Sequence, residues 1–333
     1  MKWKDKVVLV TGGTGSFGKE FIRILLETEK PGKVIVFSRD ELKQHEMRVG
    51  GFDHPNIRYF IGDVRDLERM KRAMDGVDVV VHAAALKQVP ACEYNPMEAI
   101  KTNILGTSNV VEAALEAGVE KVMALSTDKA VNPVNLYGAT KLAAEKLTVQ
   151  SNAYSGERPT RFSCVRYGNV VGSRGSVVPV FLQQRENGKI TVTDKGMTRF
   201  WLSLEQGVRF VLRCIEQMQG GEVFVPKLPS TSLMDLVAAI APDAEVEVMG
   251  IRPGEKMHEV LISEDEARTT LELEDMFVIQ PAQGPWFVHF WDKQGQALAE
   301  GFRYASNENA QTLSKTEIAK LVAPFEDELR AKG

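Results

Sequence analysis

Three residues near the middle of the chain could together remove the proton of a substrate alcohol. Tyr137 and Lys141 are four positions apart, a spacing that places both side chains on one face of a helix. A lysine ammonium beside a phenol lowers the pKa of the phenol, because it favours the phenolate. Thr127 adds a hydroxyl from the end of the strand that precedes this helix. We therefore predict a site that deprotonates an alcohol while hydride leaves the carbon that carries it.

A glycine-rich turn near the N-terminus has the spacing of a dinucleotide-binding site. Gly12, Gly15 and Gly18 follow an apolar strand pattern and stand at the start of a helical pattern. Glycine allows a tight turn, a close approach of backbone to pyrophosphate and close contact between helix and strand. The pyrophosphate then meets the free N–H groups at the N-terminus of the helix. The residues predicted to hold the cofactor here are Gly12, Thr14, Gly15, Ser16, Phe17 and Gly18.

The end of the second predicted strand bears on which dinucleotide is bound. Ser38 lies 20 residues beyond Gly18, where NAD-binding proteins usually carry an acidic residue for the ribose 2′-hydroxyl. The Ser38 hydroxyl and the Arg39 guanidinium, with Lys43 nearby, would bind the 2′-phosphate of NADP instead. The alternative is that Arg39 is an ordinary solvated charge and that Asp40 binds the ribose of NAD. The sequence favours NADP.

Two further strand ends are predicted to meet the cofactor. A carboxylate after the third strand can meet the adenine amino group, and small side chains after the fourth let the cofactor lie against backbone. The two segments are Asp63-Val64 and Ala83-Ala84-Ala85. His82, just before the second segment, is more typical of a packed histidine at a strand end than of a catalyst.

Strand and helix patterns that could position these residues alternate over the first 165 residues. Residues 7–10 and 79–81 are apolar at every position, which is typical of strands buried on both faces of a parallel sheet. Repeated strand–helix units imply right-handed crossovers and a doubly wound sheet. We predict strands at 6–11, 33–37, 57–61, 77–82, 121–126 and 161–166, and helices at 17–28, 103–117 and 135–154.

The pattern changes after Gly168, where glycines, prolines and short mixed elements dominate. The predicted fold class is therefore α/β, a Rossmann-type doubly wound parallel sheet with a smaller C-terminal substrate-binding domain. We place the dinucleotide-binding domain at 1–167 and the smaller domain at 168–333, with some of its segments returning to the first. A closing helix is predicted from Ser314.

Composition excludes several other classes of protein. The 333 residues are 44% hydrophobic and 26% charged, which is typical of a globular chain, and the net charge is −4. This balance gives no bulk attraction to nucleic acid or to an anionic membrane. No apolar stretch approaches the roughly 20 residues that a membrane span needs. Three separated cysteines and five scattered histidines indicate reduced thiols in the cytoplasm and no metal site.

Further motifs resemble those of the inverting UDP-N-acetylglucosamine 4,6-dehydratases, in the extended short-chain dehydrogenase/reductase superfamily. The resemblance runs from Lys6 to about Ser314. The motifs that carry it are Thr127-Asp128-Lys129-Ala130 followed by Asn132-Pro133, the segment from Arg166 to Ser176, and Arg252-Pro253-Gly254-Glu255-Lys256.

The resemblance implies a reaction. UDP-N-acetylglucosamine would be converted with NADP to a 4-keto-6-deoxy sugar, with inversion at carbon 5, as the first step toward pseudaminic acid. It also implies a cytoplasmic homo-oligomer, from dimer to hexamer. Tyr137, supported by Lys141 and Thr127, would serve oxidation at carbon 4; Asp128 would assist departure of the carbon 6 hydroxyl, and Lys129 would take the carbon 5 proton. The implied substrate contacts are Lys87 (which also lies near the nicotinamide), Asn169, Arg199, Arg252 and Glu255.

Several alternatives remain open at this point. Asp128 and Lys129 could be a solvated pair in a loop, and each arginine could form an ordinary salt bridge. Retaining 4,6-dehydratases typically carry membrane segments, and both they and the related dehydratase/5-epimerases usually have Met in place of Tyr137. A non-catalytic NADP-sensing regulator of the same fold would usually lack the pair formed by Tyr137 and Lys141.

Overall fold

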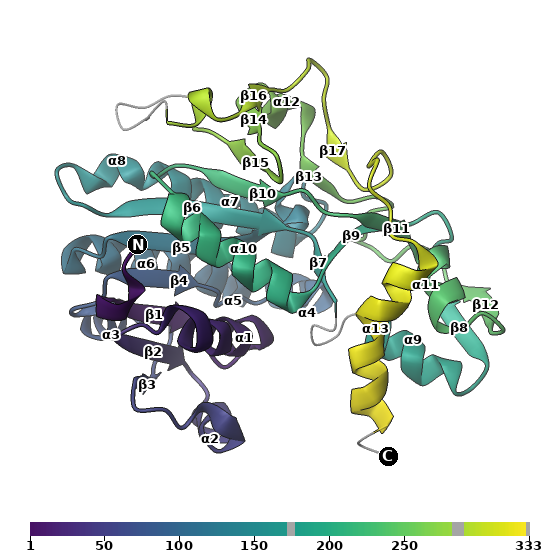
Figure 1. Cartoon of the computed structure of the whole chain (residues 1–333), viewed down its shortest axis with the longest axis horizontal. Coiled ribbons are helices and arrows are strands. Elements are labelled where there is room, and N and C mark those ends of the chain that lie inside the picture. The colour runs from purple at the N-terminus through teal and green to yellow at the C-terminus, as the bar shows by residue number, and fades with distance from the viewer. Residues whose placement is uncertain (172–176, 282–289, 331–333) are drawn as a thin grey trace.

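A central sheet organises the part of the chain that the computed structural model describes, residues 1–171, 177–281 and 290–330. Within these ranges the sheet has ten strands, and seven adjacent strands run parallel to one another (Figure 1). In their order across the sheet, they are β10 (Val223–Pro226), β6 (Arg161–Tyr167), β5 (Lys121–Thr127), β4 (Val79–His82), β1 (Val7–Thr11), β2 (Lys33–Ser38) and β3 (Ile57–Ile61). The strand order runs outward from the centre in both directions, from β1 to β3 on one side and from β4 to β6 on the other. Doubly wound folds bind their ligands at the point between β1 and β4 where this order changes.

Helices cover both faces of this sheet (Figure 1). On one face α1 (Ser16–Ile24), prolonged by the π-helical turn η2 (Leu25–Glu29), packs against α10 (Leu204–Gln217). On the other face lie α3 (Leu67–Met74), α6 (Gly106–Ala117) and α7 (Leu136–Gln150). Strand β1 is buried from both sides, because Val8 and Val10 pack with Phe21 while Leu9 packs with Met70 in the opposite layer. The predicted doubly wound α/β fold is confirmed.

The six predicted strands all form, with ends within two residues of those expected. The three predicted helices also form, but each is made of two elements. The helix predicted at 103–117 begins with the π-helical turn η4 (Lys101–Leu105), and the one predicted at 135–154 continues after Ser151 as α8 (Asn152–Ser155). Ser151 separates α7 from α8, and its hydroxyl donates to the Leu147 carbonyl over 2.6 Å.

Strands from the second half of the chain complete the sheet. β10 adds to β6 in parallel, and further strands then extend the sheet antiparallel to their neighbours. These are β15 (Met276–Ile279), β14 (Thr270–Glu272) and β16 (Gln296–Ala297). Some segments of the second half therefore lie in the same sheet as the first half, and the division at residue 167 stays a prediction.

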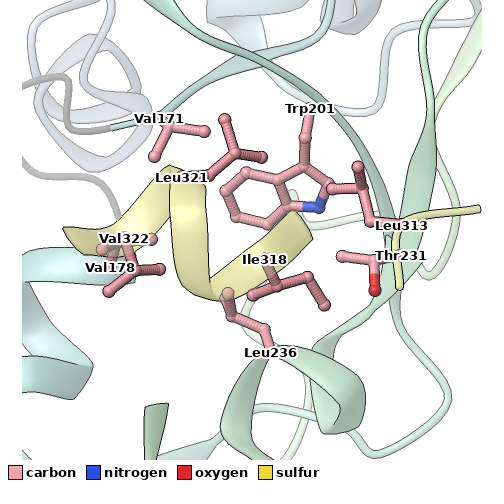
Figure 2. A pocket seen from close by; sticks show the side chains of 9 residues that line it. All are labelled: Val171, Val178, Trp201, Thr231, Leu236, Leu313, Ile318, Leu321 and Val322. Atoms are coloured by element: carbon pink, nitrogen blue, oxygen red, sulfur yellow. The ribbon is translucent and has the colours of Figure 1, made fainter. Parts of the chain in front are cut away.

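The remaining later residues form a smaller lobe beside the sheet (Figure 1). Its strands are β7 (Asn169–Val170), β9 (Thr198–Leu202), β11 (Ser230–Ser232), β8 (Lys189–Val192) and β12 (Glu245–Val248), and its helices are α9 (Val177–Arg185), α11 (Leu233–Ile240) and α13 (Lys315–Arg330). Figure 2 shows how Val178, Trp201, Leu236 and Ile318 from four of these elements converge on a small apolar cavity. The predicted closing helix is α13, and the Ser314 hydroxyl accepts from the Glu317 N–H at its start.

Shorter elements connect these layers. They are η1 (Trp3–Asp5), α2 (Glu41–Met47), η3 (Arg48–Phe52), α4 (Val89–Tyr94), α5 (Pro96–Ile100), η5 (Asp128–Ala130), β13 (Val260–Ile262), α12 (Glu264–Ala267), η6 (Trp291–Lys293) and β17 (Tyr304–Ala305). Among the described residues, no helix combines the length and the apolar character needed to cross a membrane. The same residues contain no group of three or more His, Cys, Asp or Glu side chains arranged to hold a metal ion.

Candidate active site

The glycine-rich turn connects β1 to α1 and fits a dinucleotide pyrophosphate. Gly12 has a φ of 66°, and a Cβ added to it would lie only 3.0 Å from the backbone nitrogen of Ala84. The Gly15 N–H donates to the Gly12 carbonyl over 2.9 Å, and Gly15 is the N-cap of α1. A Cβ on Gly18 would lie 2.6 Å from Gly13, so helix and strand touch at this point. The first N–H groups of α1, at Ser16 and beyond, therefore follow a turn in which Gly12, Gly13 and Gly15 add no side-chain bulk.

The end of β2 contains the residues predicted to choose between NADP and NAD. Ser38 accepts a hydrogen bond from Thr14 over 3.1 Å, which ties this strand end to the glycine turn. Asp40 caps α2, because its carboxylate accepts from the Lys43 N–H, and its other oxygen lies 2.7 Å from the Lys43 ammonium. The same contacts with Lys43 lower the pKa of Asp40. The Arg39 side chain is 53% exposed, and its guanidinium lies 3.6 Å from the Asp63 carboxylate.

The segment after β3 is held by its own neighbours. Asp63 accepts from the Arg65 side chain over 2.9 and 2.7 Å and from its backbone N–H over 3.0 Å. Burial opposes the charge of Asp63, but these bonds and Arg39 lower its pKa overall. Val64 is buried in the core against Gly106, so a cofactor would meet its backbone rather than its side chain. The predicted adenine contact of Asp63 stays a prediction.

His82, at the end of β4, has a structural role. It is 3% exposed, its Nδ1 lies 2.8 Å from the Thr11 hydroxyl and its Nε2 lies 3.0 Å from that of Thr107. Burial, with the nearby charge of Lys141, lowers the pKa of His82 to about 3, so the ring is neutral. The Thr11 hydroxyl also accepts from the N–H groups of Ala83 and Ala84. This network fixes the backbone of the alanine segment 83–85 beside the glycine turn.

The helix that carries Tyr137 and Lys141 begins directly against the end of β5. Asn135 caps α7 by accepting from the Gly138 N–H over 2.7 Å. A Cβ on Gly138 would lie 2.2 Å from the Lys129 carbonyl oxygen, so only glycine allows this approach. The close contact places the start of α7 against the segment that carries Lys129.

The electrostatics of Tyr137 differ from the sequence expectation. Burial raises the pKa of Tyr137 to about 12, and the positive charge of Lys129 and a hydrogen bond with Thr127 lower it only in part. The Lys141 ammonium donates to the Leu125 carbonyl over 2.5 Å. Burial also lowers the pKa of Lys141. Lys129 is thus a cation that lowers the pKa of Tyr137 in this structure, while the Lys141 ammonium contacts backbone; the expected effect of Lys141 on this phenol stays a prediction.

Asp128 and Lys129 form a buried cluster with a third charged residue, Glu259. The Lys129 ammonium lies 3.1 Å from Asp128 and 3.2 Å from Glu259, and it donates to the Asn169 amide oxygen over 3.3 Å. The side chains of Asp128 and Glu259 are 1% and 3% exposed. Burial opposes the charge of Lys129, but the two carboxylates outweigh it and raise its pKa. The alternative of a solvated loop pair is therefore wrong.

Glu259 was not predicted from the sequence. It lies just beyond the motif that ends at Lys256, and a single glutamate before a short strand gives no sign of burial. The fold brings it to Lys129 because β13 packs against η5. Lys256 was also missed; its ammonium donates to the Val131 carbonyl, and burial lowers its pKa.

Arg199 organises this second half of the site. Its guanidinium donates to the carbonyls of Thr198, Met257 and Lys256 over 2.7 to 3.0 Å. Its Nε lies 3.8 Å from Glu259. The predicted substrate contact of Arg199 would require one of these protein contacts to be exchanged.

The other predicted substrate residues lie around the cluster at different depths. Asn169 touches Lys129, and partial burial together with the charge of Lys129 lowers the pKa of Lys87. The Arg252 side chain is 61% exposed and lies 3.8 Å from Glu255. Their loop is anchored at Gly254, whose carbonyl accepts from the Asn135 amide over 2.8 Å. The part of the 166–176 motif from Gly172 to Ser176 lies outside the described residues.

The doubly wound sheet, the glycine turn and the Thr127, Tyr137 and Lys141 arrangement define an extended short-chain dehydrogenase/reductase. Several solved structures with this fold are complexes with NAD. The chain belongs to the polysaccharide biosynthesis protein family, whose pattern matches residues 8–281.

Relatives with known names extend over nearly the whole chain. The chain is 52% identical over 328 residues to the UDP-N-acetylglucosamine 4,6-dehydratase (inverting) of Campylobacter jejuni subsp. jejuni serotype O:2, which covers 96% of this chain and 98% of that protein. It is 40% identical to a UDP-glucose 4-epimerase of Rickettsia massiliae over 96% and 95% of the two chains. The solved structure of Pen from Bacillus thuringiensis is 42% identical, with a TM-score of 0.87 over 97% of this chain and all of that one.

Proposed function

We propose that the chain is an inverting UDP-N-acetylglucosamine 4,6-dehydratase that uses NADP. The observation that supports this most is the buried Asp128–Lys129 pair at the start of the helix that carries Tyr137. An oxidoreductase that only oxidises and reduces carbon 4 has no use for a second acid–base pair beside the tyrosine. Elimination of water needs such a pair. The likeness to the Campylobacter dehydratase over nearly the full length agrees with this chemistry.

Tyr137 acts first in the proposed mechanism. It accepts the proton of the carbon 4 hydroxyl, with the Thr127 hydroxyl and the charge of Lys129 favouring the phenolate. A bound nicotinamide would supply the acceptor for the hydride of carbon 4 and the donor of hydride to carbon 6. Oxidation at carbon 4 acidifies the hydrogen on carbon 5. The tyrosine therefore prepares the substrate for the second step.

Asp128 and Lys129 act in that second step. Lys129 receives the carbon 5 proton, and the electron pair of the carbon 5–hydrogen bond forms the double bond to carbon 6. Asp128 donates a proton to the departing hydroxyl, so water leaves. Burial and the negative charge of Glu259 raise the pKa of Asp128, which favours its protonated form and so its role as the acid. A proton then returns to carbon 5 on the opposite face, which gives inversion.

The remaining residues of the proposed site bind the nucleotide sugar and the cofactor. Arg252 and Glu255 contact the nucleotide, Asn169 and Lys87 lie on the sugar side near Lys129, and Arg199 shapes the pocket. We further propose a cytoplasmic homo-oligomer, from dimer to hexamer, whose product enters pseudaminic acid synthesis and glycosylation of flagellin or a surface polysaccharide.

The proposed function is tested with UDP-N-acetylglucosamine and the purified protein, without added cofactor, followed by NMR. A 4-keto-6-deoxy product with inverted carbon 5 is expected. A product with the original configuration at carbon 5 would indicate a retaining enzyme, and one that differs only at carbon 4 would indicate an epimerase. Absence of turnover with retained nucleotide binding would instead favour a dinucleotide-sensing regulator.

The choice of NADP leads to a prediction about Arg39. Asp40 is occupied by Lys43 and by the helix cap, whereas Arg39 has an exposed guanidinium beside the end of β2. Nucleotide released by heat should be mainly NADP by mass spectrometry. Arg39→Asp should weaken NADP relative to NAD by roughly 10- to 100-fold, because a charged hydrogen bond of about 1.5–3 kcal/mol is lost. The same change at the exposed Arg72 of α3 should leave the preference unchanged, and mainly NAD in the wild type would refute the proposal.

The role of Lys129 leads to a second prediction. Lys129→Ala should leave oxidation at carbon 4 possible, because Tyr137, Lys141 and Thr127 remain. Turnover should fall by roughly 10²- to 10⁴-fold because the base is lost. Reduced nicotinamide should accumulate, and its absorbance measures this. Lys195→Ala, at an exposed lysine of the smaller lobe, serves as the control. Wild-type incorporation of deuterium at carbon 5 from heavy water in Lys129→Ala would exclude Lys129 as the base.

A further inference from the structure

The Lys129 ammonium poses a chemical problem for a base. Asp128 and Glu259 each lie within 3.2 Å of its nitrogen and hold it in the charged form. An ammonium has no lone pair, so it can receive the carbon 5 proton only if it gives one of its own protons to a neighbour at the same time. This difficulty belongs to the proposed function, and the inference below rests on that function.

The two carboxylates beside Lys129 are not equivalent. Glu259 is surrounded by the positive charges of Lys129, Arg199 and Lys256, which together outweigh burial and lower its pKa. Burial and the charge of Glu259 raise the pKa of Asp128. Two neighbouring carboxylates whose pKa values are shifted in opposite directions can divide the roles of acid and base between them. Asp128 is therefore the carboxylate better suited to donate a proton, and Glu259 is the one better suited to accept it.

The backbone of Glu259 is fixed for this task. Its N–H donates to the Ser306 hydroxyl over 2.9 Å, and its carbonyl accepts from the Ser306 N–H over 2.8 Å. The second oxygen of each carboxylate, Oε2 of Glu259 and Oδ2 of Asp128, is buried and has no hydrogen-bond partner among the described residues. Unpartnered buried acceptors are uncommon, and here they leave one free oxygen on each side of Lys129.

We propose that Glu259 is the positioning residue that makes Lys129 a base: it receives a proton from the Lys129 ammonium as the carbon 5 proton reaches the same nitrogen. Meanwhile Asp128 gives its proton to the oxygen on carbon 6. The carbon–oxygen bond breaks, water leaves, and the electron pair of the carbon 5–hydrogen bond forms the double bond. Glu259 ends protonated and Asp128 ends ionised. The two carboxylates together therefore hold one proton before and after the step, and the buried cluster keeps its net charge.

The test compares E259Q with wild type on UDP-N-acetylglucosamine and on the same substrate carrying deuterium at carbon 5. The amide keeps the size of the side chain but cannot receive the proton. In E259Q we expect kcat to fall by roughly 10- to 1,000-fold while KM changes less than about threefold. The isotope effect on kcat should rise, because removal of the carbon 5 hydrogen becomes rate-limiting, and reduced nicotinamide should accumulate. E264Q, at an exposed acid of α12, should behave as wild type.

A merely structural role for Glu259 would slow every step, including oxidation at carbon 4, and would leave the isotope effect unchanged; this outcome overturns the inference. E259D retains a carboxylate at greater distance, so it should be more active than E259Q and still show a raised isotope effect. If E259Q does not fold, E259D alone decides by its isotope effect. Wild-type protein without dehydration product refutes the proposed function and this inference together. Wild-type turnover combined with wild-type kinetics of E259Q refutes only the inference.

Discussion

Replacing Tyr137 by phenylalanine is expected to lower turnover by roughly 10²- to 10⁴-fold, because the acceptor for the carbon 4 hydroxyl proton is lost while the ring remains. The ring packs with Cys92 and Ala99, and phenylalanine keeps these contacts. Binding of cofactor and of nucleotide sugar should therefore change little. In contrast to Lys129→Ala, this variant should form no reduced nicotinamide, which stopped-flow absorbance measures directly.

The pH dependence gives a second measurement for Tyr137. Burial raises the pKa of Tyr137 to about 12, so the reactive phenolate is the minor form near neutral pH and its fraction grows as pH rises. The rate of carbon 4 oxidation in the wild type should therefore increase between pH 7 and 9, and the increase should be absent in Tyr137→Phe. Tyr154→Phe, on the exposed side of α8, is the matched control. Normal oxidation at carbon 4 in Tyr137→Phe would show that another group takes this proton.

Removing the side chain of Arg166 is expected to give the largest loss of stability. Arg166 is completely buried and lies between two carboxylates, Glu145 of α7 and Glu266 of α12, at 2.5 and 2.8 Å. It also donates to the Leu261 carbonyl in β13 over 2.8 Å. Arg166→Ala leaves both carboxylates buried without their cation, which costs about 3–5 kcal/mol.

The measurement for Arg166 is the free energy of unfolding in urea. Arg209→Ala is the control, because Arg209 pairs with Glu205 on the exposed surface of α10, and exposed pairs contribute about 0–1 kcal/mol. Equal losses in the two variants would show that the buried cluster does not stabilise the fold. Because Arg166 connects the helix of Tyr137 to the strand that follows Glu259, a partly folded Arg166→Ala protein should also be inactive.

The parallel part of the sheet could be predicted because the local sequence pattern is enough to identify its strands. In β1, residues 7–10 are all apolar, as in a strand buried on both faces, and the glycines that follow require a turn before a helix. The later strands could not be placed this way. β14, β15 and β16 join the sheet through β10, and its strands β1 to β6 lie more than a hundred residues earlier in the chain. Short strands give no local sign of their partner.

The residues of the site also differ in whether local sequence or tertiary packing brings them together. Thr127, Tyr137 and Lys141 share one strand end and one helix, so their spacing is enough to bring them together. The charge state of the site depends on Glu259, which reaches Lys129 only through the tertiary packing of β13 on η5. The effect of Lys129 on Tyr137 was not foreseen for the same reason: the contacts of each ammonium are set by backbone and carboxylates elsewhere in the fold.

The position of β10 between β6 and β15 has a consequence for folding of the chain during its synthesis on the ribosome. When residue 167 has been synthesised, β6 has one unpaired edge, and this edge stays open until residues 223–226 emerge. Open edges of this kind recruit other strands, including those of neighbouring nascent chains. The first half is therefore exposed to misassembly for as long as some 60 further residues take to be made, a few seconds at about 5–20 residues per second.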